Sequence, residues 1–139
     1  MQSRANANAN ANAPDEVGTA LLAELRSRIP AVRVLTNGPE YAKAVALFNA
    51  AVDVRPSVVV WCATTADVRA GIRASRNHGV PLSVRGGGHD FWGRVFRPGG
   101  LVLDLTDMRG VQVDIGRRVA TVGGGALSSD VVPAAETAG

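Results

Sequence analysis

Several residue types are scarce in this sequence, and each shortage excludes a class of protein. The single cysteine, Cys62, rules out a disulfide within the chain and a metal site built from several cysteines. Cys62 lies in the apolar run 58–62, so its expected role is that of a small core residue. No apolar run approaches the roughly 20 residues that a transmembrane helix needs, and no signal-peptide core follows the N-terminus. We therefore expect a cytoplasmic protein with no membrane partner, the alternative being a protein that leaves the cytoplasm by a route this sequence does not show.

Lysine and aromatic residues are also rare. Aromatic residues make up 4% of the chain, and all but one of its 15 lysine and arginine residues are arginine, Lys43 being the exception. The formal net charge is only +3, and no basic stripe alternates with aromatic residues, which argues against nucleic-acid binding. With 139 residues, of which 46% are hydrophobic, the chain has the size of one domain or of part of one.

The sequence divides into a tail and a folded part. Residues 5–12 read ANANANAN and offer nothing apolar to bury, so residues 1–14 are predicted to form a disordered low-complexity tail. Residues 15–139 are then the folded part. The chain ends without a terminal cap or a returning strand, which we interpret as a domain truncated at its C-terminus.

Two helices are predicted ahead of the first buried strand. The first spans about 15–30, and its apolar residues share one face: Leu21, Leu22, Leu25 and Ile29. The second starts at Asn37 as a cap, with Pro39 in its first turn and Glu40 at the capping-box position. Its apolar face holds Tyr41, Val45 and Phe48. A hairpin turn at Asn37–Gly38 is the weaker alternative, because no alternating strand follows it.

The remaining pattern predicts an α+β domain. Residues 57–61 indicate a buried strand, and a Thr64–Asp67 capping box starts a helix that places Val68 and Ile72 inward and ends at Gly79. A strand at 82–84 comes next, and a meander of alternating strands follows it: 101–105, 111–115 and 119–122. Another helix is expected from about residue 127. Because helices and a buried strand precede the meander, the order does not fit a strict βαβ alternation.

A run of three glycines, Gly86 to Gly88, follows the strand at 82–84, and a second run, 123–125, follows the last strand. One interpretation of the first run is a tight turn with positive φ angles. The other is a backbone nest whose N–H groups bind an anion such as a pyrophosphate. The run fits neither a G-x-G-x-x-G dinucleotide motif nor a P-loop, because no suitable helix or Gly-Lys-Ser/Thr follows it.

His89 comes directly after the first glycine run. A lone histidine is usually a polar surface residue or a hydrogen-bonded core residue, and His78 near Gly79 has the pattern of the former. No second histidine or cysteine stands at ligand spacing from His89, so a metal site is not expected. The glycines before His89, together with Asp90 and the aromatic pair after it, favour a functional role instead.

Four segments of the chain together resemble one family. The loop RGGGHD at 85–90 resembles the flavin-attachment loop of the berberine-bridge-enzyme-like FAD-linked oxidases, in the vanillyl-alcohol-oxidase superfamily. Residues 41–56 are similar to its segment ending in N-x-x-x-D-x-R-P, and residues 58–84 are similar to its strand, helix and second strand. Residues 101–114, LVLDLTDMRGVQVD, resemble its L-V-x-D-L-x-x-M-x-x-V-x-V-D stretch. The resemblance covers about residues 35–139.

The resemblance implies the N-terminal half of a two-subdomain FAD-binding domain of the PCMH type. It also implies that His89 bonds covalently to the 8α-methyl group of the flavin, and that glycine N–H groups face the pyrophosphate. Arg85 would either add charge there or brace the loop. The implied cofactor-binding residues are Arg85, Gly86, Gly87, Gly88, His89, Asp90 and Gly93. Relatives often carry serine at the first glycine and at Asp90, which puts only local hydrogen bonding in doubt.

The implied function is that of an FAD-dependent oxidoreductase that oxidises an alcohol, a sugar or an amine-bearing carbon of a small-molecule substrate, with oxygen as the usual acceptor. No catalytic residue and no metal ligand is expected in this chain, and Cys62 does not occupy the position at which some relatives attach the flavin a second time. Two alternatives stay open: a truncated fragment without activity, and a nucleotide-binding module that holds its ligand noncovalently.

Overall fold

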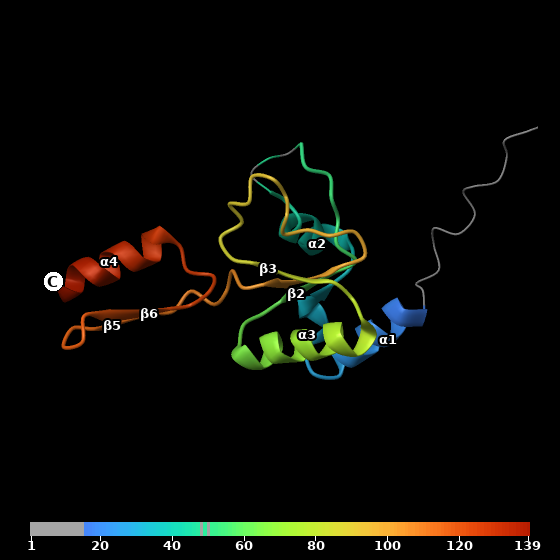
Figure 1. Cartoon of the computed structure of the whole chain (residues 1–139), viewed down its shortest axis with the longest axis horizontal. Helices are drawn as coiled ribbons and strands as arrows, with labels where there is room; N and C mark the ends of the chain where they lie inside the picture. The colour runs from blue at the N-terminus through green and yellow to red at the C-terminus, as the bar shows by residue number, and fades with distance from the viewer. Residues whose placement is uncertain (1–15, 48, 50) are drawn as a thin grey trace, which may run out of the picture.

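The computed structural model describes residues 16–47, 49 and 51–139, which form an α+β fold (Figure 1). The predicted tail, residues 1–14, lies outside the described residues. In chain order the elements are α1 (Glu16–Arg26), the 3-10 helix η1 (Ala31–Arg33), β1 (Val34–Leu35), α2 (Gly38–Ala44), β2 (Val58–Trp61), α3 (Thr65–His78), β3 (Leu82–Arg85), β4 (Leu101–Asp104), β5 (Val111–Asp114), β6 (Val119–Val122) and α4 (Ser128–Ala138). Within the described ranges, no helix is long and apolar enough to cross a membrane.

Four strands form one mixed sheet in the order β1-β2-β4-β3. Strands β2, β4 and β3 run parallel, whereas β1 pairs with β2 in the antiparallel direction. The register sets Trp61, Asp104 and Arg85 level with one another at the carboxyl ends of the three parallel strands. The loop after Arg85 therefore starts at the sheet edge where open parallel sheets bind their ligands.

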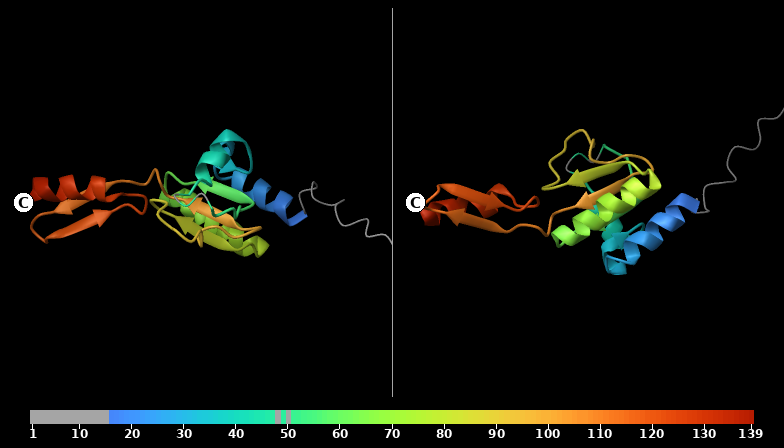
Figure 2. Two further views of the ribbon diagram at one scale, coloured as in Figure 1. Left: turned by 90° about the horizontal axis from the view of Figure 1, so that it is seen from above. Right: turned by 60° about the horizontal axis from the view of Figure 1, so that its bottom comes forward.

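The core lies on both faces of this sheet. Helices α1 and α3 lie side by side on one face, where Leu21, Leu25 and Ile29 are buried against β2 and β4 (Figure 2). On the other face, residues of α2 and of the loops around it cover a smaller cluster that includes Val102. All four residues of β4 are buried, so the prediction that residues 101–105 alternate between a buried and an exposed face was wrong. The reason is that β4 is central and covered on both sides.

The first two helices differ in part from the pattern. Helix α1 ends at Arg26, earlier than predicted, although the turn after it still buries Ile29. Asn37 does occupy the N-cap of α2, but its side chain makes no capping hydrogen bond. The Glu40 carboxylate binds Lys43 Nζ at 2.8 Å, so the predicted capping box does not form. Phe48, assigned to the apolar face of this helix, lies outside the described residues.

Helix α3 has the predicted ends. Thr64 Oγ1 accepts the N–H of Asp67 at 3.2 Å, and Asp67 Oδ2 accepts the N–H of Thr64 at 2.9 Å, so the capping box forms. Gly79 ends the helix in the left-handed conformation, with φ +63°. The predicted inward residues Val68 and Ile72 are only partly buried, whereas Gly71 packs directly against Leu103 of β4. The missing side chain at Gly71 lets the helix approach the sheet closely.

Strands β5 and β6 form a separate antiparallel hairpin, and α4 packs along it. We call these three elements the arm, because they extend away from the sheet in every view (Figures 1 and 2). The predicted meander was therefore wrong. Strand β4 lies between β2 and β3, which occupy both of its edges and leave none for β5. The predicted alternation within 111–114 does occur.

Candidate functional site

The loop that follows β3 presents backbone donors that have no partner in the described part of the chain. The N–H groups of Gly86, Gly87, Gly88 and His89 donate no hydrogen bond to any of the described residues. Gly88 has φ +74°, a conformation that favours glycine over other residues. Consecutive free N–H groups in such a turn form a concave donor set suited to an anion.

The second glycine run lies directly against the first. A Cβ atom added at Gly86 would stand 2.8 Å from the carbonyl oxygen of Gly124, and one at Gly87 would stand 2.7 Å from Leu127 Cδ2. The second run is held in place by the N–H of Gly125, which donates to Met108 O at 3.0 Å. The first loop needs glycine at this contact, whereas the glycines of the second run are required by the close approach of residues 105–110, so the two backbones lie directly beside each other.

Sequence reasoning noted residues 123–125 but gave them no role in the site. The signal that would have found them is the repeated pattern of a strand that runs into three glycines. This pattern occurs first at β3 and again at β6. The site therefore includes a segment that lies beyond the predicted residues along the chain.

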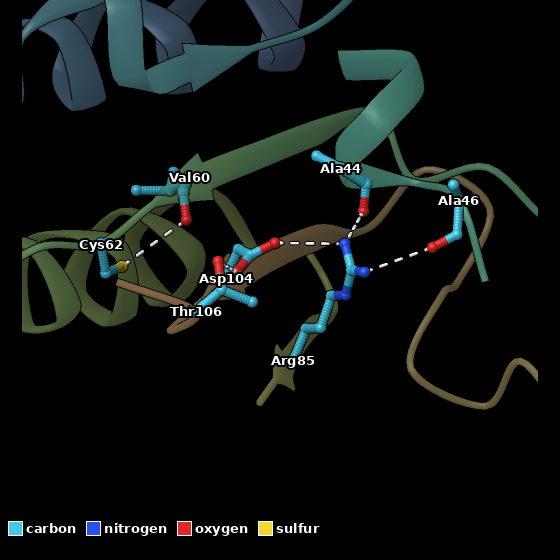
Figure 3. Close-up of polar contacts among 7 residues, drawn as sticks. All are labelled: Ala44, Ala46, Val60, Cys62, Arg85, Asp104 and Thr106. Atoms are coloured by element: carbon cyan, nitrogen blue, oxygen red, sulfur yellow. Dashed lines mark hydrogen bonds and ion pairs between the residues drawn. The ribbon is translucent and has the colours of Figure 1, made fainter. Parts of the chain in front are cut away.

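Arg85 lies beneath the loop rather than on its outer side. Its Nη1 donates to the carbonyl oxygen of Ala44 and pairs with Asp104 Oδ2 at 3.3 Å, and its Nη2 donates to Ala46 O at 3.2 Å (Figure 3). A Cβ atom at Gly88 would stand 2.9 Å from Arg85 Nη2, so the loop rests on the guanidinium group. Of the two roles that the sequence left open, these contacts correspond to bracing the loop.

His89, Asp90 and Gly93 differ in what surrounds them. The His89 side chain is exposed and makes no hydrogen bond or ion pair with any residue that the structure describes. The Asp90 carboxylate accepts the N–H groups of Trp92 at 3.2 Å and of Val95 at 2.7 Å, so it shapes the turn after His89. Gly93 is buried with φ +67°, and a Cβ atom there would overlap Val52.

Two aromatic side chains stand exposed next to His89. Phe91 is 52% exposed and Trp92 is 69% exposed, and their rings meet edge to face with centroids 5.3 Å apart. Large aromatic side chains usually lose most of their accessible surface on folding, so an exposed pair beside a donor set marks this surface as a candidate contact for a planar apolar group.

Comparison with known proteins identifies the family. Residues 56–139 match the FAD binding domain family. The chain belongs to this family. It is 38% identical over 78 residues to (R)-6-hydroxynicotine oxidase of Paenarthrobacter nicotinovorans, an alignment that covers 56% of this chain and 17% of the relative. It is 37% identical over 81 residues to glucooligosaccharide oxidase of Sarocladium strictum, covering 57% of this chain and 16% of the relative.

Solved structures agree with this assignment. The fold matches that of Phl p 4, a grass pollen allergen with glucose dehydrogenase activity, with a TM-score of 0.79 and 27% identity over 86% of this chain and 27% of that one. It also matches 6-hydroxy-D-nicotine oxidase from Arthrobacter nicotinovorans, with a TM-score of 0.71 and 31% identity over 76% of this chain and 24% of that one. The chain thus spans about a quarter of these structures. Its α+β fold is similar to that of part of the FAD-binding domain of these enzymes.

The residues of the loop fit FAD, the cofactor of this family. Its pyrophosphate carries negative charge and several acceptor oxygens, and Gly86, Gly87 and Gly88 supply consecutive N–H donors without partners among the described residues. The carbonyl oxygen of Gly124 leaves no room for a Cβ atom at Gly86, and the Leu127 side chain crowds one at Gly87. Both features suit close approach of the backbone to a phosphate group.

Cys62 and His78 lie apart from this loop. Cys62 is fully buried, and burial, followed by the negative charges of Asp67 and Asp104, raises the pKa of its thiol to about 12. A thiol with that pKa stays protonated and unreactive at neutral pH. His78 ends α3 and contacts Glu24 of α1, with 3.0 Å between Nε2 and Oε2. Among the described residues, no three potential metal ligands gather into a group.

Proposed function

We propose that this chain holds FAD in a flavin-dependent oxidoreductase, with the loop at 86–89 as the main contact to the pyrophosphate. The observation that carries the proposal is the set of four consecutive N–H groups without described partners, set at the carboxyl edge of the parallel strands. A bound phosphate would accept charge-assisted hydrogen bonds from these groups. The second glycine run, 123–125, lies beside this loop and borders the proposed site.

His89 is proposed as the site of covalent attachment, as the resemblance of RGGGHD implies. Its side chain is exposed and has no hydrogen-bond or ion-pair partner among the described residues, so an imidazole nitrogen is free to bond to the 8α-methyl carbon of the flavin. In the net reaction the imidazole nitrogen and the methyl carbon each lose one hydrogen. Dioxygen takes up the two hydrogens with their electrons.

The other predicted site residues are proposed to shape the loop. Asp90 holds the turn at 90–95 through two backbone N–H groups, and Gly93 allows the close contact with Val52. Arg85 supports the loop from below through its contact with Gly88. These residues would set where His89 and the glycine N–H groups stand.

The reaction is proposed to be the oxidation of an alcohol, a sugar or an amine-bearing carbon in a small molecule. Bound FAD would accept a hydride from the substrate, and oxygen would be the electron acceptor. The names of the relatives support this range, since they include a hydroxynicotine oxidase, a glucooligosaccharide oxidase and an allergen with glucose dehydrogenase activity. Substrate contacts and a catalytic base are expected outside this chain.

A second candidate is a module that binds FAD noncovalently. It is favoured by one observation: His89 has no partner among the described residues that would orient its ring or take its proton. In that case His89 would form no covalent bond to the flavin.

Acid precipitation of the purified full-length protein separates the two candidates. Covalent flavin stays with the pellet, and the tryptic peptide 86–94 carries its mass, whereas noncovalent FAD leaves with the supernatant. His89→Ala should release the flavin into the supernatant, and His78→Ala, the matched control at the end of α3, should not. Absence of FAD from both fractions of the wild-type protein would refute the proposal.

A further inference from the structure

Asp104 is a buried carboxylate at the centre of the sheet edge, with a residue exposure of only 3%. Burying a carboxylate is costly unless it is paired and hydrogen-bonded. Asp104 Oδ1 accepts Thr106 N at 2.9 Å and Thr106 Oγ1 at 2.6 Å, and Oδ2 pairs with Arg85 Nη1 at 3.3 Å (Figure 3). Both oxygens are therefore occupied by donors from the chain, and the side chain acts on its surroundings through Arg85.

The Arg85 guanidinium joins three segments of the chain. It binds the carbonyl oxygens of Ala44 and Ala46 at the end of α2, and it binds Asp104 at the end of β4. The glycine loop rests on it, because a Cβ atom at Gly88 would stand 2.9 Å from Nη2 and 3.2 Å from Nε. The position of the guanidinium thus determines the height of the loop above the sheet.

Packing alone does not fix that position. Arg85 and Asp104 both border a pocket of about 250 Å³ between α2 and the strand ends. Arg85 Nε is buried without a hydrogen-bond partner, so it adds no restraint of its own. The restraints that remain are two backbone carbonyls at the end of α2 and the single negative charge of Asp104, which is fixed in a central strand.

We propose that Asp104 is a positioning residue for FAD binding: through Arg85 it fixes the glycine loop and so the place of His89. The inference rests on the proposed FAD site. Asp104 is separated from the loop by the guanidinium group, and its own contacts are Thr106 and Arg85. It takes no part in binding the cofactor directly.

Asp104→Asn is the sharpest variant, because it keeps the shape and removes the charge. In either orientation of the new amide its NH₂ group faces a donor, Arg85 on one side or Thr106 on the other. The guanidinium should shift, and a misplacement of about 1 Å near a reacting group slows a reaction by roughly 100-fold. The matched control is Asp53→Asn, since Asp53 pairs with Arg55 but its side chain is 84% exposed.

The experiment adds FAD to the full-length apoprotein below its unfolding temperature and follows flavin on peptide 86–94 by mass spectrometry. Hydrogen exchange of the loop and thermal unfolding are measured on the same samples. Asp104→Asn should slow attachment by roughly 10- to 100-fold and speed exchange at 86–92 in the FAD-bound protein, while Asp53→Asn matches the wild type. If His89 carries no flavin, the dissociation constant for FAD replaces the attachment rate.

Thr106→Val is the second variant, for use if Asp104→Asn does not fold. It removes only the hydroxyl group that donates to Asp104, so it should slow flavin attachment by a smaller factor. A folded Asp104→Asn or Thr106→Val protein that attaches flavin at the wild-type rate, with wild-type exchange in the loop, would overturn the inference. A variant with a lower unfolding temperature but normal attachment would mean that Asp104 serves stability alone. A wild-type protein that binds no FAD would instead refute the proposed function.

Discussion

A single methyl group at Gly86 tests whether the contact between the two glycine runs serves the cofactor. In Gly86→Ala the new Cβ atom would stand 2.8 Å from the carbonyl oxygen of Gly124, whereas ordinary contacts begin at 3.4 Å. The two runs must therefore separate by about 0.6 Å, from 2.8 to 3.4 Å. The obstacle is a backbone atom rather than the end of a flexible side chain, so the loop itself has to move.

The size of the effect follows from the donors that this movement displaces. A hydrogen bond to a charged group contributes about 1.5–3 kcal/mol, so losing one between the loop and a phosphate should weaken FAD binding by roughly 10- to 150-fold. On folding, the clash with Gly124 destabilises the loop, and this loss is offset in part by the roughly 0.4–1 kcal/mol that alanine contributes by restricting the unfolded chain. The variant is therefore expected to lose FAD affinity while it keeps most of its stability.

Fluorescence titration of full-length apoprotein with FAD measures the affinity, and thermal unfolding of the same samples measures the stability. Gly110→Ala is the matched control, because no atom lies within 4 Å of the position of its new Cβ atom and its backbone is not left-handed. Wild-type FAD affinity in Gly86→Ala would show that the close contact between residues 86 and 124 has no part in holding the cofactor.

Two further predictions concern titratable groups. Burial raises the pKa of the Cys62 thiol to about 12, so a thiol reagent at pH 8 should label the protein only after denaturation, and labelling of the folded protein would contradict this. Hydrogen bonding to Arg109, followed by the N–H of Leu127, lowers the pKa of Asp130 below its ordinary value. The Asp130–Arg109 pair therefore contributes to stability at pH values above the ordinary pKa of aspartate. This contribution is lost as the pH falls through the lowered pKa of Asp130. The protection factor of the Leu127 amide against hydrogen exchange should therefore fall in acid, and Arg109→Ala should remove much of this pH dependence.

The sequence predicted an element well where the signal depends on residues only a few positions apart. The capping box of Thr64 and Asp67 and the left-handed Gly79 define α3, and both depend on contacts a few residues apart. Asn37 does occupy the N-cap of α2, but the capping box predicted with Glu40 does not form, and the glutamate pairs with Lys43 instead. The spacing of residues alone does not decide between two such partners.

The sequence did not predict which strands pair with one another in the sheet. The alternation at 101–105 suggested a strand with one buried and one exposed face, but β4 lies between β2 and β3 and is buried on both faces. The order of strands in a sheet depends on contacts between distant segments, which periodicity does not report. The same limit applies to the site, where the contact of Gly124 with Gly86 joins residues from two separate loops.

The central claim is that the N–H groups at 86–89 hold the pyrophosphate of FAD, and hydrogen exchange of these amides in apo and FAD-bound full-length protein tests it most directly. In the structure they have no hydrogen-bond acceptor among the described residues, so they should exchange fast without FAD. With FAD bound, peptides spanning 86–94 should exchange much more slowly, while peptides from α1 stay unchanged. Bound FAD with unaltered exchange at 86–89 would contradict the claim.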